Sequence, residues 1–255
     1  IAIGGGNGDS ATDNTEKTEA TGEKSTAIGY NAKAKTANDL AVGRGATSSG
    51  GSSTALGYDA TSSGEGSVAI GAGTDALGAM PAKQVKATAK NAIAIGRATQ
   101  ATSQDATAIG TDATASNTDA IAIGRKSNAS GSTSIGFGYN TQSTATNTVA
   151  IGTDVSATAE SAIALGRKTT ASALNATAVG PIANASGKYS SAFGMSAAAS
   201  KENSLALGTN ANASLDKSVA LGSDSTTATN ATSQGSVVIG GKTITWNGSP
   251  PVTGT

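Results

Sequence analysis

Residues 121–124 read Ile-Ala-Ile-Gly, and close variants of this apolar-Ala-apolar-Gly tetrapeptide recur along the chain of 255 residues. Most of the closing glycines lie fourteen residues after the previous one. A short fixed period predicts a repeat architecture in which each unit is one structural module. The recurring glycines stand at positions 4, 29, 43, 57, 71, 96, 110, 124, 136, 152, 166, 180, 194, 208, 222 and 240.

Two kinds of departure from the period carry information. The intervals from Gly4 to Gly29 and from Gly71 to Gly96 each exceed one repeat by eleven residues, which predicts insertions within residues 5–28 and 72–92. Around Gly136 the intervals are 12 and 16, and counting from Gly138 instead restores fourteen on both sides. This irregularity predicts a local register shift near Phe137.

Each unit reads as one coil made of two strands. Ile93 and Ile95 flank an alanine, and this period-two alternation places them on one face of a strand. Small residues alternate again after the glycine, as at Ala113 and Ala115, followed by Gly, Ser, Thr and Asn, which favour turns. A parallel strand-helix unit needs a dozen or more residues in its crossover alone, so fourteen residues are too few. The sequence therefore predicts an all-β parallel β-solenoid, a rod about 70 Å long at one coil per roughly 4.8 Å.

The composition limits the function. Aromatic residues make up only 3% of the chain, and a core of Ala, Gly, Ser and Thr must bring backbone segments unusually close. Seventeen basic residues balance seventeen acidic ones, so nothing favours binding to nucleic acid. No apolar run reaches the roughly 20 residues that span a bilayer.

We expect no catalytic site, cofactor or metal. The chain has no His and no Cys, and its carboxylates are dispersed, so we find no acid-base pair and predict that it is not an enzyme. The hexapeptide-repeat acyltransferases, a catalytic rival with a β-helix, have a period of six and use a histidine base. The segment 5–9 imitates one turn of a calcium-binding nonapeptide repeat, but such a site needs successive turns.

The repeat also predicts association of chains. Alanines fit the thin interior between two short strands, which leaves part of the larger aliphatic stripe facing outward. Such a stripe would exceed the few hundred Å² of apolar surface that monomers usually expose, and parallel cyclic assembly of identical chains would bury it. The alternative is a monomeric solenoid with both apolar positions inside.

Several units resemble the YadA-like head repeat of trimeric autotransporter adhesins, over about residues 1 to 240. The resemblance is carried by Asn147–Gly152, Ser67–Gly71, Asn203–Gly208 and Ser218–Gly222. It implies a left-handed parallel β-roll assembled as a parallel homotrimer, exposed on the outer surface of a Gram-negative bacterium. It also implies a virulence function, attachment to host extracellular matrix or cells, with collagen or fibronectin as partner, and autoaggregation.

The chain departs from the family's full pattern in lacking a neck motif, stalk heptads and an anchor, so a membrane would be reached only through an anchor domain outside it. We expect residues 1–240 to form the head and residues 241–255 a connector or the start of a following module.

Two sets of residues are candidate ligand contacts. The aliphatic residues that match the family motif associated with collagen binding also fit a purely structural packing role: Val68, Ile70, Val149, Ile151, Leu205, Leu207, Val219 and Leu221. Residues just after the glycines form possible surface contacts: Tyr30, Tyr58, Arg125, Lys126, Arg167 and Lys168. Asp112 and Asp154 alternate with these cations, so a ladder of charges that sets the register is the alternative.

The two insertions differ in charge and are candidates for specificity. The first carries Asp9, Asp13, Glu16, Glu19 and Glu23, and the second carries Lys83, Lys86 and Lys90 with Pro81. Two rival functions remain open: a non-adhesive spacer that projects another module, and an ice-binding solenoid. Thr does not keep one phase of the repeat, which disfavours the second.

Overall fold

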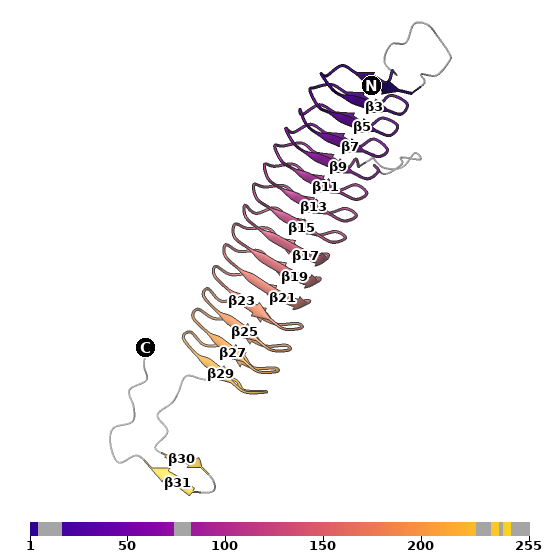
Figure 1. Cartoon of the computed structure of the whole chain (residues 1–255). Coiled ribbons are helices and arrows are strands. Elements are labelled where there is room, and N and C mark those ends of the chain that lie inside the picture. Colours follow the sequence, from indigo (N-terminus) through magenta and orange to yellow (C-terminus); the bar gives the residue numbers. More distant parts are fainter. Residues whose placement is uncertain (5–16, 74–82, 228–235, 240–241, 246–255) are drawn as a thin grey trace.

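A computed structural model describes residues 1–4, 17–73, 83–227, 236–239 and 242–245. These residues form two long parallel sheets in a rod, with a separate two-stranded sheet near the C-terminus (Figure 1). Each coil of the rod adds one strand to the fifteen-stranded sheet A and one to the fourteen-stranded sheet B. The all-β parallel solenoid predicted from the repeat is confirmed.

Sheet A consists of the odd-numbered strands, in chain order: β1 (Ala2–Ile3), β3 (Thr26–Ile28), β5 (Leu40–Val42), β7 (Thr54–Leu56), β9 (Val68–Ile70), β11 (Ile93–Ile95), β13 (Thr107–Ile109), β15 (Ile121–Ile123), β17 (Ile135–Tyr139), β19 (Val149–Thr153), β21 (Ile163–Arg167), β23 (Thr177–Val179), β25 (Ser191–Phe193), β27 (Leu205–Leu207) and β29 (Val219–Leu221). Sheet B consists of the even-numbered strands: β2 (Glu19–Ala20), β4 (Lys33–Ala34), β6 (Thr47–Ser48), β8 (Thr61–Ser62), β10 (Lys86–Ala87), β12 (Gln100–Ala101), β14 (Thr114–Ala115), β16 (Asn128–Ala129), β18 (Gln142–Ser143), β20 (Ser156–Ala157), β22 (Thr170–Ala171), β24 (Asn184–Ala185), β26 (Ala198–Ala199) and β28 (Asn212–Ala213). The separate sheet holds β30 (Ser236–Ile239) and β31 (Lys242–Thr245).

The parallel register continues unbroken across both insertions. Ala2 pairs with Ala27, and Val68 pairs with Ile93, so equivalent positions of neighbouring coils remain aligned. Regular coils resume at β2 and β10, so the insertions are narrower than residues 5–28 and 72–92. Glu19, Glu23, Lys86 and Lys90 therefore belong to coils, whereas Asp9, Asp13, Glu16, Pro81 and the segment 5–9 lie outside the described residues.

The predicted register shift near Phe137 is wrong. Ile123 pairs with Phe137 and Phe137 with Ile151, so the fourteen-residue spacing continues through β17. Gly138 is the recurring glycine, and Gly136 takes the place of the central alanine. A Cβ at Gly136 would lie 2.8 Å from Ser127 Oγ and 3.0 Å from Thr141 Oγ1, so the missing methyl group makes room for two internal hydroxyl groups.

The parallel stack ends earlier than the expected boundary at residue 240. Beyond β29, Thr226 forms a parallel bridge with Asn212, whereas β30 pairs antiparallel with β31. Residue 240 falls between the two strands of this hairpin and lies outside the described residues. That residues 241–255 connect to or begin another module stays a prediction.

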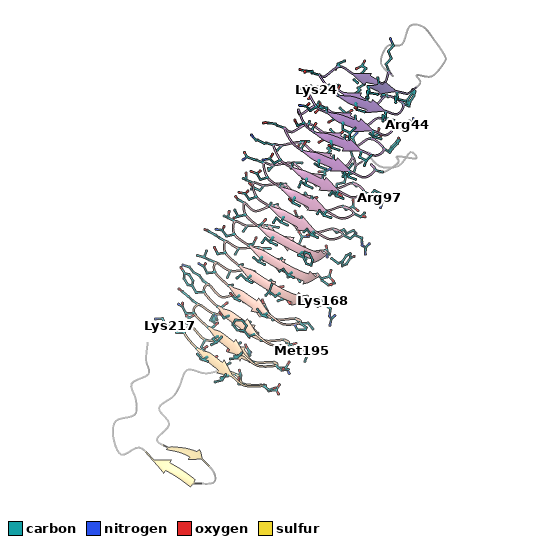
Figure 2. The ribbon with its side chains drawn as sticks, viewed as in Figure 1. Lys24, Arg44, Arg97, Lys168, Met195 and Lys217 are labelled. Atoms are coloured by element: carbon teal, nitrogen blue, oxygen red, sulfur yellow. The ribbon has the colours of Figure 1, made fainter. Side chains whose placement is uncertain are left out.

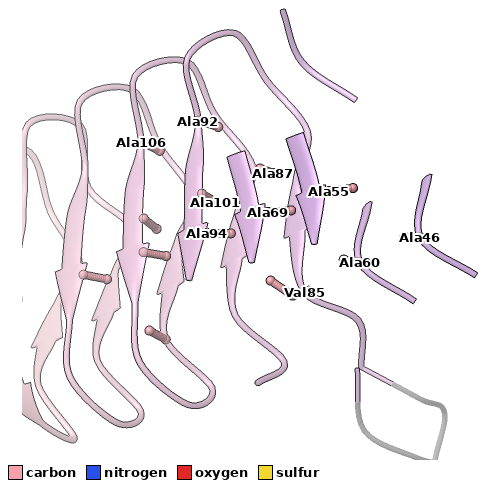
Figure 3. Packing of buried hydrophobic residues seen from close by; sticks show 14 of the residues in the cluster. Ala46, Ala55, Ala60, Ala69, Val85, Ala87, Ala92, Ala94, Ala101 and Ala106 are labelled. Atoms are coloured by element: carbon pink, nitrogen blue, oxygen red, sulfur yellow. The ribbon is translucent and has the colours of Figure 1, made fainter. Parts of the chain in front are cut away.

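Alanine fills the interior between the two sheets (Figure 3). Ala94 at the centre of its sheet A strand and Ala87 and Ala101 on sheet B are fully buried, as are their equivalents in most coils. Methyl groups suit this thin space, because larger side chains would force the sheets apart at the close packing typical of protein interiors. The sequence-based placement of alanine inside the coil is confirmed.

The chain turns twice in each coil, and both turns place a residue in the left-handed region. These residues recur every seven positions, as at Lys24, Asn31 and Asn38, with φ between 51° and 63° when they are not glycine. We call the side of the rod formed by each recurring glycine and the two residues after it the glycine edge. The other turn forms the opposite edge.

The recurring glycine is required by conformation and by space. From Gly29 to Gly222 these glycines have φ between 109° and 141°, where residues with a Cβ are strained. A Cβ on Gly110 would lie 2.7 Å from the carbonyl oxygen of Gly124 in the next coil. One missing side chain per coil thus permits the close stacking of backbones.

We expect Gly110→Ala to destabilise the rod by about 1–3 kcal/mol, because it combines backbone strain with a clash against the next coil. Urea unfolding followed by circular dichroism measures this loss. The matched control is Gly66→Asn, since Gly66 has φ of 65° at a turn position where other coils use Asn. Similar losses in both variants would contradict the special role of Gly110.

Asp39 places a carboxylate inside the rod. Asp39 is 1% exposed, and Oδ1 accepts hydrogen bonds from the Gly51 and Ser53 amides and from Ser53 Oγ in the next coil. Oδ2 accepts from the amide and hydroxyl groups of Thr36. Burial raises the pKa of Asp39, but the hydrogen bonds from Thr36 and Ser53 together outweigh it and hold the pKa below its ordinary value.

Because the pKa of Asp39 is lowered by folding, its stabilising contribution is present above the ordinary aspartate pKa and disappears as the pH falls through the folded value. We expect Asp39→Ser to lower the stability by about 1–3 kcal/mol at pH 7. The gap to the unsubstituted protein should narrow as the pH falls below the ordinary aspartate pKa. Urea unfolding at a series of pH values measures it, and a gap that does not change with pH would contradict this role.

Candidate binding surfaces

The outer face of sheet A carries a continuous apolar stripe. In every coil with a sheet A strand, the residue before the recurring glycine is Ile, Val, Leu or Phe, and parallel pairing stacks these residues along the rod, as with Ile95, Ile109 and Ile123. Their side chains point away from the alanine interior and are half-buried or exposed. Phe137 is 51% exposed and Leu207 is 43% exposed.

A second column on the same face is mixed in character. Three positions before the glycine, Val68, Ile121, Val149 and other apolar residues share the pairing ladder with Thr54, Thr107 and other hydroxyl residues, without a regular order. The apolar stripe is therefore continuous in the first column and interrupted in the second. The alternative of a solenoid that hides both apolar positions in its own interior is wrong, because the interior accommodates only the alanine between them.

The residues matching the family motif lie in these two columns. Val68, Ile70, Val149 and Leu205 are half-buried, and Ile151, Leu207, Val219 and Leu221 are exposed. None of them belongs to the buried interior of the chain. The structure thus brings the motif residues into one surface, and their role in ligand binding stays a prediction.

The glycine edge carries aromatic and cationic side chains in stacked positions. Arg44 lies over the rings of Tyr30 and Tyr58, with its Cζ 5.7 Å and 5.6 Å from the two centroids. The three residues occupy the same position in consecutive coils, so the guanidinium group is held between two rings. Arg125 makes a similar contact with Tyr139, at 4.4 Å. The fourteen-residue spacing of Arg44 from both tyrosines is the signal in the sequence that could have identified this contact.

The alternating charges of the glycine edge do not pair with one another as predicted. Within the described residues, Asp112 forms its ion pair with Lys83, at 3.8 Å between Nζ and Oδ1, and Asp154 accepts a hydrogen bond from Asn140 Nδ2 at 2.8 Å. Lys126, Arg167 and Lys168 are exposed on this edge. The charge ladder is replaced by cation-π contacts and amide-carboxylate hydrogen bonds.

The described part of the chain contains no group of three or more His, Cys, Asp or Glu residues arranged to hold a metal ion. It also contains no helix with the length and apolar character needed to cross a membrane.

Comparison with known proteins identifies the repeat. The family model described as the YadA head domain repeat (two copies) matches most of the rod. The matched residues are 20–46, 48–74, 87–112, 101–127, 129–154, 157–181, 171–197 and 199–225. The chain belongs to the YadA head-repeat family.

Among solved structures, this YadA-family head is similar to the crystal structure of the collagen-binding domain of the Yersinia adhesin YadA. The two share 23% sequence identity over 76% of this chain and 72% of the other, with a TM-score of 0.23. No curated protein matches the sequence. The family is that of an adhesin head and not of an enzyme class, so the chain has an adhesin-type role.

We expect Arg44→Gln to destabilise the head by about 1 kcal/mol, because two exposed cation-π contacts are lost. Arg97→Gln is the matched control, since Arg97 is also exposed on the glycine edge but has Ala72 and Thr111 in the neighbouring coils. Thermal unfolding of both variants measures the difference. Equal effects would show that the aromatic sandwich adds no stability.

Proposed function

We infer that this chain is the head of a homotrimeric adhesin on the surface of a Gram-negative bacterium, and that it attaches to host extracellular matrix, with collagen as the first ligand to test. The observation that carries the proposal is the apolar stripe of sheet A, which runs along the rod in a chain that belongs to an adhesin head family. Fibronectin binding and autoaggregation are further expectations from the same family resemblance.

The stripe supports assembly of identical chains. The continuous row of half-buried and exposed Ile, Leu, Val and Phe side chains forms a larger apolar area than monomers usually leave in contact with water. Parallel cyclic association brings each coil against the same coil of its neighbours, so one short pattern is satisfied along the whole rod. Such an assembly would bury the first column of the stripe, and the Thr residues of the second column would lie near its boundary.

Assembly also constrains where a ligand binds. If the stripe is buried between chains, Ile151 and Leu207 act mainly by holding the trimer together, and ligand contacts come from surfaces that remain open. Tyr30, Tyr58, Arg125 and Lys126 on the glycine edge are the candidates for those contacts. Repetition of weak contacts along three parallel chains would raise the overall affinity through avidity.

The outer face of sheet B does not favour the ice-binding alternative. Its outward positions hold Thr47, Thr61 and Thr114, but Gln100 and Asn128 occupy the same column in other coils. The face lacks the uniform Thr ladder on which an ice-binding solenoid would depend. The remaining alternative is a spacer that binds no ligand, and a binding experiment distinguishes it from an adhesin head.

The experiment compares the unsubstituted chain with Ile151→Asp and Thr158→Asp. We expect the unsubstituted chain to have three times the 24.3 kDa mass of one chain by light scattering and to bind immobilised collagen. Ile151→Asp should reduce both mass and binding, because each copy would bury a charge in the stripe. Thr158→Asp should leave the mass unchanged, since Thr158 is exposed directly after β20 and away from the apolar stripe.

Two results would contradict the proposal in different ways. A stable monomer of the unsubstituted chain would disprove the trimer. A stable trimer without affinity for collagen, fibronectin or a second head would leave the spacer as the function.

A further inference from the structure

The glycine edge holds an exposed apolar cluster formed by Pro181, Ile182 and Met195. Ile182 is 48% exposed and Met195 is 49% exposed, and Pro181 is exposed beside them. Most other coils place charged, hydroxyl or amide residues, glycine or tyrosine at the equivalent positions. The cluster lies on the edge of the rod, where Figure 2 shows Met195 on the same side as Lys168, Arg97 and Arg44.

Backbone hydrogen bonds fix the three residues relative to one another. The Ile182 amide donates to the Arg167 carbonyl oxygen at 2.8 Å, and the Ser196 amide donates to the Pro181 carbonyl oxygen at 2.9 Å. The same ladder continues from the Asn210 amide to Met195. Arg167, Pro181 and Met195 therefore occupy one position in three consecutive coils, and the backbone that carries the cluster is held by this ladder.

Ile182 occupies a backbone conformation that disfavours it. Its φ is 63°, in the left-handed region, where Asn, Asp and Gly serve in most other turns of the rod. A β-branched aliphatic residue is a genuine outlier there. The coil imposes this conformation at every equivalent position, so Ile182 carries backbone strain that Asn would relieve, and an outlier of this kind motivates a functional hypothesis.

The charges beside the cluster indicate the chemistry of its partner. Arg167 and Lys168 project from the preceding coil, are exposed, and form no ion pair within the described residues. The coil on the other side contributes the neutral residues Thr209 and Asn210. Asp154 lies one coil before Lys168, where it accepts a hydrogen bond from Asn140, and offsets part of this charge. A ligand that covers Ile182 and Met195 therefore meets a net positive charge on one side, which favours a carboxylate next to its apolar group.

We propose that Pro181, Ile182 and Met195, together with Arg167 and Lys168, form a docking site for an extended protein segment that carries an apolar side chain flanked by carboxylates. The site does not rest on the collagen proposal, because Tyr30, Tyr58, Arg125 and Lys126, the contacts proposed there, lie on other coils of the glycine edge. Apolar contact supplies the affinity, and the two cations set the orientation and the preference for acidic segments.

The test uses the purified head and a short fluorescein-labelled peptide of repeating Leu-Glu-Ser, with Leu-Lys-Ser and Ser-Glu-Ser peptides as controls. Fluorescence anisotropy should show at least tenfold tighter binding of the first peptide than of either control. Ile182→Asn should weaken that binding at least fivefold and raise the melting temperature, because Asn tolerates the left-handed conformation. Thr111→Asn, on the same edge in a distant coil, is the matched control and should leave binding unchanged.

Each contrary result overturns a defined part of the proposal. Equal binding of the three peptides would exclude a site for acidic, apolar segments, and unchanged binding in Ile182→Asn would exclude this cluster. A change of solution mass in Ile182→Asn would show instead that the cluster is a contact between copies of the head. Collagen binding of Ile182→Asn, measured in parallel, should equal that of the unsubstituted head. Loss of peptide binding and loss of collagen binding therefore test the two proposals independently.

Discussion

The close stacking of backbones at the recurring glycine is the constraint on which the rest of the structure depends. At Gly110 and its equivalents, φ lies in a region suited to glycine, and the next coil's carbonyl occupies the space of a side chain. Every coil must therefore reverse direction at the same point. Because the reversals coincide, strands pair in register over the length of the rod, and each side chain repeats its environment from coil to coil.

The narrow interior that results determines what faces outward. Only methyl-sized groups fit between the sheets in most coils, so Ala94 lies inside while Ile93 and Ile95 are directed to the outer face. In one coil Gly136 replaces the central alanine and leaves room for the internal hydroxyl groups of Ser127 and Thr141. The apolar stripe of this adhesin-type head is thus a consequence of core geometry, and the proposed association of chains would cover it.

Residue types at the two edges are less restricted than those of the interior, because the edge side chains do not enter the space between the sheets. Their backbone is fixed by left-handed residues every seven positions, but the side chains can vary from coil to coil. At the glycine edge, Arg44 lies between Tyr30 and Tyr58 in one region, and Ile182 occupies a strained backbone conformation in another. A uniform scaffold therefore carries local, non-repeating surfaces at its turns, which is where loops on rigid folds usually acquire specificity.

The sequence alone determined the parallel solenoid, the inward alanines, the outward stripe and the family, because a fixed period transmits the same local geometry to every coil. Tertiary structure decided features that depend on which residues meet across coils. The pairing of Phe137 with Ile123 shows that Gly136 takes the place of the central alanine. Asp112 pairs with Lys83, and Asp154 accepts a hydrogen bond from Asn140, so neither contacts the predicted cations. The burial of Asp39 and the position of Arg44 between two rings also require contacts with residues about fourteen positions away. The repeat spacing places such residues in neighbouring coils, but it does not determine which of their side chains make contact.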